Sequence, residues 1–518
     1  MNKIKVIDLF AGPGGLGEGF ARFQPHSGND QRPFKIVCSA EKDPDAAKTL
    51  RLRTFYRLCK ERGKVPDSYF KYIQGKIGQP YERSTEKLWK KAEGEASPIK
   101  LGTEQGDRLL KKTLEQRIEK GDRSVLIGGP PCQAYSLVGR ARNRGVSGYS
   151  AKDDTRHFLY EHYLHILAQH RPVAFVMENV KGLLSSRVGS ERIFPKILED
   201  LVNPGKAAGT RARPRYRIHA LAKPTTFSEG DDYRDLNLRD FVIQSELYGI
   251  PQARHRVILL GVRVDANLEP SLLRPSKYKL NSTHALQTLP KLRSGISRKQ
   301  VTTKDWQRIV HEAISFAFEK GLPQDLKTKM ESKFDEDRIA QGKFKQGSRF
   351  VPVPYPRKGR AEAEQKFLEK ILNSRCGGAL NHEARNHMPM DLVRYLFATT
   401  YAEKHENSPK APEFPKALAP NHRNWKSGKF TDRFRVQLPN RPSTTVTSHL
   451  SKDGHYFIHY DPIQCRSLTV REAARLQTFP DDYFFEGSRT SQYIQVGNAV
   501  PPILAEQIAE LIWKMIEA

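Results

Sequence analysis

The sequence predicts an α/β fold, in which a mixed, mostly parallel sheet is covered by helices on both faces, together with a second, smaller and basic domain. Three observations predict it. Apolar runs of strand length alternate with helical stretches, a glycine-rich loop follows the first run, and the alternation stops in a long basic region before order returns near the end. A chain of 518 residues also exceeds what one hydrophobic core usually serves, which indicates two or more domains.

The chain opens on a strand, a glycine-rich loop and a second strand. Residues Ile4 to Phe10 form an apolar run that breaks into the loop Ala11 to Gly15 (AGPGG), and a helix is expected around residues 19–23. A second apolar run, Phe34 to Ala40, ends at Glu41. This β-α-β opening is typical of open sheets that bind ligands at the carboxyl ends of their strands.

Three further strands are expected at Val125 to Ile127, Val173 to Met177 and Val257 to Val262, because each apolar run is bounded by turn residues or proline. A helical stretch, Phe158 to Gln169, lies between two of them. Residues 51–122 are polar and highly charged and lack the apolar strands of their neighbours. We interpret this stretch as an insertion.

The alternation stops at Val264. From there to Asn440 prolines and basic residues multiply, which predicts a second domain. Helical order then returns: Thr469 and Glu472 form a capping box that opens a helix through Gln477.

Pro501 and Pro502 begin a final helix with one apolar stripe. The stripe consists of Ile503, Leu504, Ile508, Leu511, Ile512 and Met515. Because such a stripe needs a core to pack on, we expect the end of the chain to return to the sheet. The predicted division is therefore a first domain at 1–263 with an insertion at about 51–122, a second domain at 264–440, and a return segment at 441–518.

The composition points to a polyanionic partner. Lys and Arg number 87 against 58 Asp and Glu, so the formal charge is +29, and nucleic acid leads the possible partners. With 38% hydrophobic residues the chain is too apolar to be disordered, yet it has no run long enough to span a membrane and no signal peptide, so we expect a cytoplasmic protein. Its five cysteines are scattered and odd in number, which favours reduced thiols over a disulfide framework.

The loop from Gly12 to Gly17 satisfies the spacing G-x-G-x-x-G, and Glu41 lies 24 positions beyond it. Glycines let the backbone approach a ligand, and a carboxylate at the end of the second strand can accept the hydroxyls of a ribose. A dinucleotide and S-adenosylmethionine would both suit such a loop. A tight turn without any ligand is the alternative.

One thiol stands where open α/β sheets keep their chemistry. In VLIGGPPCQ, Cys132 lies just past a strand end on a backbone that the prolines make rigid, so we favour a nucleophile. An inert core cysteine is the alternative, but Gly, Pro and Gln are poor core neighbours. The following loop carries Arg140, Arg142 and Arg144 among glycines, and it is either a basic loop that closes over a phosphate backbone or an ordinary solvated loop.

Six short blocks follow one another along the chain. They are DLFAGPGG from Asp8, PCQ from Pro131, ENV from Glu178, QARHR from Gln252, REAARLQ from Arg471 and QVGNA from Gln495. In this order they resemble the conserved blocks of DNA (cytosine-5)-methyltransferases of the bacterial restriction-modification type. The resemblance covers residues 1–50, 123–263 and 464–518, and it leaves the insertion and the basic region, where that family keeps its target-recognition domain, without a match.

The resemblance implies a Rossmann-like, S-adenosylmethionine-dependent methyltransferase domain and a catalytic set. Carbon 5 of cytosine is too weak a nucleophile to attack a sulfonium methyl group, so a thiolate that adds at carbon 6 is chemically apt, and Cys132 would supply it. Glu178, at the end of an apolar strand, would protonate ring nitrogen 3. Arg254 and Arg256 alternate along a strand start and are expected on one face. Arg256 would bind the exocyclic oxygen of the base and Arg254 would hold the site together.

By the same resemblance, eight residues would line the S-adenosylmethionine pocket: Phe10, Gly12, Gly14, Glu41, Pro131, Leu159, Asn498 and Ala499. The family also has a Gly-Asp block whose Asp binds the adenine amine. Neither Gly75-Lys76-Ile77 nor Gly106-Asp107 matches it well, so that contact stays unassigned.

The implied substrate is a specific sequence of double-stranded DNA. The reacting edge of cytosine lies inside the stack, so the base must be flipped out, and Val264 to Asn440, with Pro442 to Val446, would read the sequence. We expect a monomer associated with the nucleoid, without a membrane partner, and a separate cognate restriction endonuclease. No metal is expected, because Cys376, His382 and His387 have irregular spacing.

Three other functions remain open. RNA cytosine-5 methylation would use the same chemistry, although the large basic region favours duplex DNA. A DNA-binding protein with a degenerate catalytic domain would also share the fold. A dinucleotide-dependent oxidoreductase is suggested by the glycine loop alone.

Overall fold

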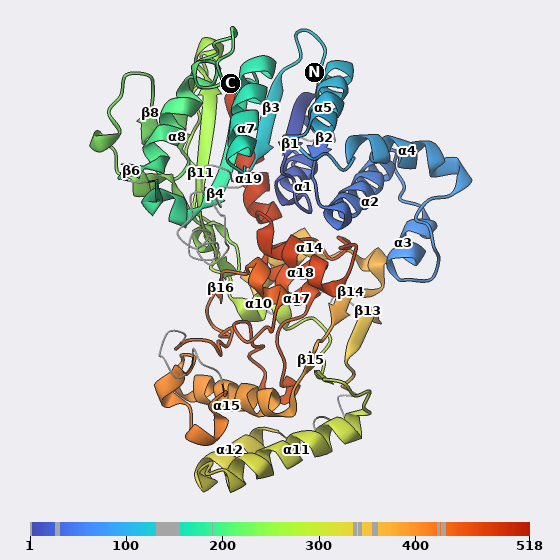
Figure 1. Cartoon of the computed structure of the whole chain (residues 1–518). Coiled ribbons are helices and arrows are strands. Elements are labelled where there is room, and N and C mark those ends of the chain that lie inside the picture. Colours follow the sequence, from blue (N-terminus) through green and yellow to red (C-terminus); the bar gives the residue numbers. More distant parts are fainter. Residues whose placement is uncertain are drawn as a thin grey trace.

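A computed structural model describes residues 3–25, 32–130, 156–188, 190–334, 344–354, 361–421 and 431–517, together with the single residues 339 and 425. Its main sheet has eight strands in the order β2-β1-β3-β4-β11-β7-β8, with β9 beside β11. Figure 1 shows this sheet at one end of the molecule, with both termini near it, and the helices α11, α12 and α15 at the other end.

The first half of the sheet is parallel. It contains β1 (Ile4–Leu9), β2 (Phe34–Ala40), β3 (Ser124–Gly128) and β4 (Ala174–Val180). Each strand lies within a few residues of its predicted range, because a strand buried on both faces has a nearly continuous apolar sequence that marks its limits well.

The second half of the sheet is antiparallel. It contains β7 (Tyr216–Ala220), β8 (Thr226–Phe227), β9 (Val242–Gln244) and β11 (His255–Arg263), and β11 pairs antiparallel with β4, β7 and β9. The sheet is thus mixed, as expected, but the parallel arrangement holds only for its first four strands. The short connections from β7 to β8 and from β9 to β11 suit antiparallel pairs, because a parallel pair needs a long crossover.

Helices cover both faces of the sheet. On one face α1 (Gly15–Arg22) and α19 (Pro502–Glu517) pack together, and on the other lie α5 (Glu104–Arg117), α7 (Arg156–His170) and α8 (Ile193–Val202). The apolar stripe of the final helix is buried in the hydrophobic cluster of the sheet. The predicted capping box at Thr469 is confirmed.

Helix α1 begins four residues earlier than expected. Its glycines are needed for close packing: a Cβ at Gly15 would lie 2.1 Å from the carbonyl oxygen of Val500, and one at Gly19 would lie 2.3 Å from the Cβ of Ala505. Low helix propensity therefore hid a helix that tertiary contacts stabilise.

Residues 51–122 are mainly helical. Helix α2 (Pro44–Glu61) leads into α3 (Asp67–Ile73), α4 (Glu86–Glu95) and then α5. Apolar side chains of α2, α3 and α4 form a cluster that also includes Cys376, Leu380 and Phe484, whereas Leu110 and Leu114 of α5 belong to a cluster of the sheet. The stretch that we interpreted as an insertion thus connects the sheet to later parts of the chain.

The region from 264 to 440 contributes to three hydrophobic clusters, one of which is the cluster that Cys376 and Leu380 share with α2, α3 and α4. Helices α11 (Thr303–Glu319), α12 (Gln324–Lys333) and α15 (Pro389–His405) enclose another. Helices α10 (Ser282–Leu286) and α14 (Glu362–Ile371) instead pack on the cluster of the sheet, near α17 (Val470–Leu476) and α18 (Arg489–Asn498). The domain limits at 263 and 440 stay a prediction.

The remaining described elements are short. They are β5 (Arg187–Val188), β6 (Glu191–Arg192), α9 (Pro204–Ala207), β10 (Gln252–Ala253), β12 (Gly295–Ile296), β13 (Gly347–Pro352), β14 (Gly378–Glu383), β15 (Asn386–His387) and β16 (Ser443–Thr444). Among the helices of the described ranges, none has the length and apolar character needed to cross a membrane.

Candidate active site

The predicted site residues follow neighbouring strand ends. Leu9 of β1 pairs with Ala40 of β2 on one side and with Gly128 of β3 on the other, and Gly128 pairs with Met177 of β4. The carboxyl ends of β2, β1, β3 and β4 therefore lie side by side along one edge of the sheet, where open α/β sheets bind their ligands.

The glycine loop follows β1 at this edge, and Glu41 at the end of β2 holds it by hydrogen bonds. The backbone turns left-handed at Phe10 (φ 53°), Gly12 (φ 56°) and Gly14 (φ 93°), and at the last two positions glycine adopts this conformation without strain. The amide of Gly12 donates to Oε2 of Glu41 at 2.8 Å, and the amide of Asp43 donates to Oε1 at 2.8 Å. A Cβ at Gly12 would meet nothing within 4 Å, so the loop faces open space there.

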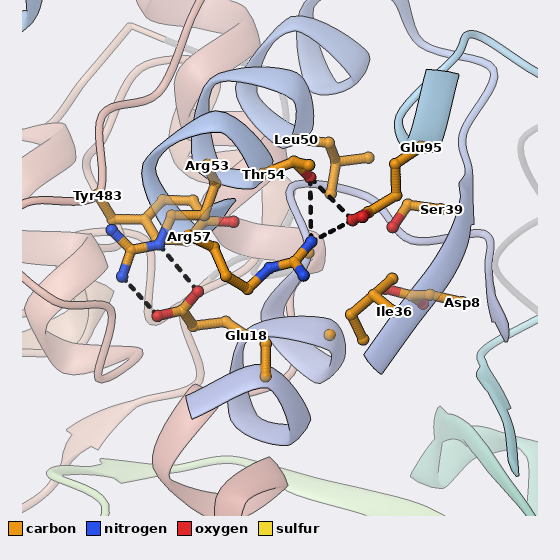
Figure 2. A pocket seen from close by; sticks show the side chains of 13 residues that line it. Asp8, Glu18, Ile36, Ser39, Leu50, Arg53, Thr54, Arg57, Glu95 and Tyr483 are labelled. Carbon is orange, nitrogen blue, oxygen red and sulfur yellow. Dashed lines mark hydrogen bonds and ion pairs between the residues drawn. The ribbon is translucent and has the colours of Figure 1, made fainter. Parts of the chain in front are cut away.

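A small polar cavity lies beneath the same loop (Figure 2). It has room for about one water molecule, and among the residues that line it are Asp8, Ser39, Arg57 and Glu95. Burial, together with the nearby carboxylates of Glu41 and Glu95, raises the pKa of Asp8 well above its usual value. The underside of the loop is thus polar and closely packed.

The turn between α18 and α19 completes the loop region. Asn498 ends α18 with its side chain exposed, Ala499 follows it and is buried, and Val500 packs against Gly15. The turn is fixed by Gln477, whose Nε2 donates to the carbonyl oxygens of Val496 and Ala499 at 2.8 and 3.2 Å. Residues at opposite ends of the sequence therefore meet at one site.

The segment 98–102 lies between Glu41 and Leu159, and sequence reasoning missed it. Pro98 forms a bridge with Glu41, and the amide of Ile99 donates to the Glu41 carbonyl at 2.9 Å. A Cβ at Gly102 would lie 3.3 Å from Cδ2 of Leu159. The amide of Gly102 also donates to Oδ1 of Asp107 at 3.0 Å, so the Gly106-Asp107 pair lies near this segment. No other signal in the sequence marks it.

Glu178 and Arg256 meet at the end of β4. Nε of Arg256 lies 2.9 Å from Oε1 of Glu178, and both side chains are 14% exposed. A Cβ at Gly129 would lie 2.9 Å from Oε2 of Glu178, and Nδ2 of Asn179 donates to the carbonyl of Pro130 at 3.1 Å. The segment that leads to Cys132 is therefore fixed beside the Glu178–Arg256 pair. Pro131, Cys132 and the arginines of the following loop lie outside the described residues.

Arg254 is buried and contacts backbone rather than open space. It donates to the carbonyls of Val446 at 2.8 Å and Gly497 at 3.3 Å, and burial together with the charge of Arg256 lowers its pKa. The charges of Arg256 and Glu178 both act on Arg254, so the three groups lie near one another, although the hydrogen bonds of Arg254 go to backbone carbonyls. Arg254 precedes β11, which begins at His255, and the common face of Arg254 and Arg256 stays a prediction.

The four described cysteines are all buried. Burial raises the pKa of the Cys38 thiol to about 12 and that of Cys59 to about 11, and it raises the pKa of Cys376 and Cys465 as well. Buried thiols of this kind are poor nucleophiles, because the thiolate is the reactive form.

His382 and His387 have partners of their own. His382 contacts Oγ1 of Thr469 and the carbonyl of Pro290, both at 2.9 Å. His387 contacts the hydroxyl of Tyr395 and that of Ser467, each at 3.2 Å. Each ring is therefore held by hydroxyl or carbonyl groups.

Comparisons with known proteins identify the family of the chain. Residues 100–205 and 237–514 match the family of C-5 cytosine-specific DNA methylases. The Type II methyltransferase M.Bpa9945I of Bacillus paralicheniformis is 33% identical over 99% of both chains, and the Type II methyltransferase M.AgeI of Thalassovita gelatinovora is 27% identical over 98% of this chain and 99% of its own.

A solved structure shares the fold. It is described as a candidate DNA modification methyltransferase encoded within a prophage of E. coli, and it is 19% identical, covers 100% of both chains and superposes with a TM-score of 0.53. The family match spans more than half of this chain, and a relative more than 30% identical spans nearly all of it. The chain therefore belongs to the C-5 cytosine-specific DNA methylases and is a DNA (cytosine-5)-methyltransferase.

Proposed function

We propose that the protein transfers a methyl group from S-adenosylmethionine to carbon 5 of a flipped-out cytosine in one duplex DNA sequence, through a covalent adduct with Cys132. The supporting observation is the single sheet edge on which the glycine loop, the segment leading to Cys132 and the Glu178–Arg256 pair follow one another. This order brings a cofactor side and a base side within one site.

The glycine loop has the features that an adenosine-bearing cofactor needs. Glu41 uses one acceptor site of each carboxylate oxygen for the amides of Gly12 and Asp43, which leaves further lone pairs for two ribose hydroxyls. The open space over Gly12 admits a ligand close to the backbone. Leu159 and Gly102 would form the apolar wall beside it, and the exposed side chain of Asn498 would contact the ligand from the turn after α18.

In this proposal the residues of the base side share the chemistry. The thiolate of Cys132 adds to carbon 6 of cytosine while Glu178 gives a proton to ring nitrogen 3 and Arg256 binds the exocyclic oxygen. Carbon 5 becomes enamine-like and takes the methyl group, and S-adenosylhomocysteine would be the second product. A water molecule then takes the proton on carbon 5, the thiolate leaves carbon 6 and the proton on ring nitrogen 3 returns to Glu178, which restores the ring. S-adenosylmethionine, when bound, supplies the electrophilic sulfonium methyl group.

Arg254 would act as a positioning residue. It holds Val446 and Gly497 by their carbonyls, so it connects the strand that carries Arg256 to the turn that carries Asn498. The formal charge of +29 supports a polyanionic substrate, and the region 264–440 would read the target sequence in a monomeric complex. Because two relatives are named type II methyltransferases, we also propose that this enzyme protects host DNA from a separate endonuclease of the same specificity, in the cytoplasm at the nucleoid.

The test is methyl transfer from tritiated S-adenosylmethionine to duplex DNA from a methylation-free host. We expect label in cytosine for the wild type and none for Cys132→Ala. Cys59→Ala is the matched control, because it removes a buried thiol with a raised pKa and should keep activity. Normal methylation by Cys132→Ala would overturn the mechanism.

A trapping experiment tests the adduct itself. Duplex DNA with 5-fluorocytosine at the target, which bisulfite sequencing identifies, should become covalently attached to the wild type and not to Cys132→Ala. Transfer to RNA in preference to DNA in a competition would instead favour the RNA methyltransferase.

A further inference from the structure

Arg53 of α2 lies at the centre of a buried ion cluster beneath the glycine loop (Figure 2). Its Nε and one Nη donate to the two carboxylate oxygens of Glu18 at 2.9 and 2.6 Å, and its other Nη donates to Oδ1 of Asp482 at 2.8 Å. The three side chains are 12%, 6% and 6% exposed. This guanidinium thus joins two distant segments, since Glu18 lies on α1 and Asp482 precedes α18.

The same guanidinium lies against two tyrosine rings. Its Cζ is 4.3 Å from the ring centre of Tyr56 and 4.9 Å from that of Tyr483. The hydroxyl of Tyr483 donates to the carbonyl of Pro13, and a Cβ at Gly14 would lie 3.0 Å from the same hydroxyl. Arg53 therefore contacts both supports of the glycine loop: the helix that follows it and the tyrosine beneath it.

The chemistry of the cluster requires arginine. A planar guanidinium can bind one carboxylate with two parallel hydrogen bonds, bind a second carboxylate with its third nitrogen and still lie flat on a ring, whereas an ammonium group can do only part of this. Asp482 is also held by Nδ2 of Asn373 at 2.8 Å, and its pKa stays below its usual value because the charge of Arg53 and these hydrogen bonds offset burial. The cluster is satisfied by residues from four separate segments.

From these contacts we infer that Arg53 is a positioning residue for the cofactor, and that it fixes the glycine loop by tying α1 to Asp482 and Tyr483. The inference rests on the proposed function, because it takes the glycine loop as the cofactor site. A shift of Pro13 moves the amide of Gly12, and with it the carboxylate of Glu41 that this amide binds. Loss of Arg53 therefore weakens cofactor binding and leaves the base side in place.

The test compares variants by calorimetric titration with S-adenosylmethionine and by DNA binding without cofactor. Removal of Arg53 alone would leave two buried carboxylates without a positive partner. The main variant therefore replaces all three charged side chains by uncharged ones: Glu18→Gln, Arg53→Met and Asp482→Asn together, called the neutral variant. We expect its Kd for S-adenosylmethionine to rise about 10-fold, within the range of couplings measured inside one hydrogen-bonded network. KM for the cofactor should rise equally, with kcat at saturating cofactor and the Kd for DNA within about twofold of wild type.

Two single-residue variants test the same inference if the neutral variant does not fold. Tyr483→Phe removes only the hydroxyl that binds Pro13 and should raise the Kd for S-adenosylmethionine about threefold, the loss expected for one hydrogen bond. Arg51→Met is the matched control on the same helix, because Arg51 pairs loosely with Glu93 at 3.6 Å, and it should leave that Kd unchanged.

The outcomes separate this inference from the proposed function. If the wild type does not bind S-adenosylmethionine, the proposed function fails. If the wild type binds it and the folded neutral variant and Tyr483→Phe bind it equally well, only the role of Arg53 fails. An equal loss of DNA and cofactor affinity would also overturn the role, since a general loss of structure would then explain both.

Discussion

Gln477 offers a direct test of how the two halves of the site are joined. Its side chain is fully buried, and its Nε2 donates to the carbonyls of Val496 and Ala499 on the proposed cofactor side. Its Oε1 accepts from Nε2 of Gln252 at 3.1 Å. Gln252 in turn accepts the amide of Val446 at 2.7 Å and lies two residues before Arg254. One pair of glutamines thus connects both sides.

Replacement of Gln477 by Met removes this connection with little change in volume. Two donated hydrogen bonds and one accepted hydrogen bond are lost, and each contributes about 1 kcal/mol net to stability. Burial of the apolar Met side chain offsets part of this loss, because Met leaves water more readily than Gln does. The Nε2 of Gln252 keeps one partner, because it also donates to the Leu476 carbonyl at 3.1 Å, and the Oε1 of Gln252 keeps the amide of Val446. We therefore expect a loss of about 2 kcal/mol in the free energy of unfolding.

The measurement is a urea titration followed by far-UV circular dichroism. The midpoint should fall in Gln477→Met while the slope stays unchanged, because the surface exposed on unfolding is the same. Gln79→Met is the control, since Gln79 is exposed, and it should change stability by less than about 0.5 kcal/mol. A Gln477→Met protein as stable as the wild type would refute the reasoning.

Two further predictions concern stability. Gly19→Ala should destabilise the protein by about 1–3 kcal/mol, because the new methyl group would overlap Ala505 of α19, whereas Gly78→Ala has open space; equal thermal shifts in the two variants would contradict this. Burial lowers the pKa of both His382 and His459 to about 4. Below pH 6.5 each histidine therefore binds a proton more readily in the unfolded chain than in the folded one, and by pH 4 each lowers the free energy of unfolding by up to about 3 kcal/mol. Equal unfolding free energies at pH 7.5 and pH 5 would be inconsistent with these two histidines.

Local patterns predicted the sheet and the end of the chain well. The strand Phe34 to Ala40 appears with its predicted limits, and the stripe from Ile503 to Met515 packs as its period required. In both cases burial itself dictates the sequence, because a strand inside a covered sheet must be apolar throughout and an amphipathic helix must repeat every three to four residues. Each pattern is complete within one segment.

No such local pattern in the sequence marks the residues that hold the glycine loop in place. Arg53 and Asp482 are 429 positions apart, and Tyr483 and Pro13 are 470 apart, so nothing near either residue indicates its partner. Arg53 lies in a charged stretch whose composition is typical of a solvated surface. Its side chain is only 12% exposed, because the carboxylates of Glu18 and Asp482 and the ring of Tyr483 come to it from distant parts of the sequence. Composition alone does not distinguish a solvated arginine from a buried one that has found its partners.

Because these contacts join the first and the last residues of the chain, they also affect the order in which the protein folds. The glycine loop lies within the first fifteen residues, but Tyr483, Val500 and Ala505 pack against it or against α1, as Figure 1 shows for α1 and α19. Until the last forty residues arrive, α1 has no surface on which to bury its glycine-lined face, and its low helix propensity gives it little stability alone. The glycine loop therefore acquires its shape late, when pairing across almost the whole sequence closes the sheet domain, and such long-range closure is a slow step in folding.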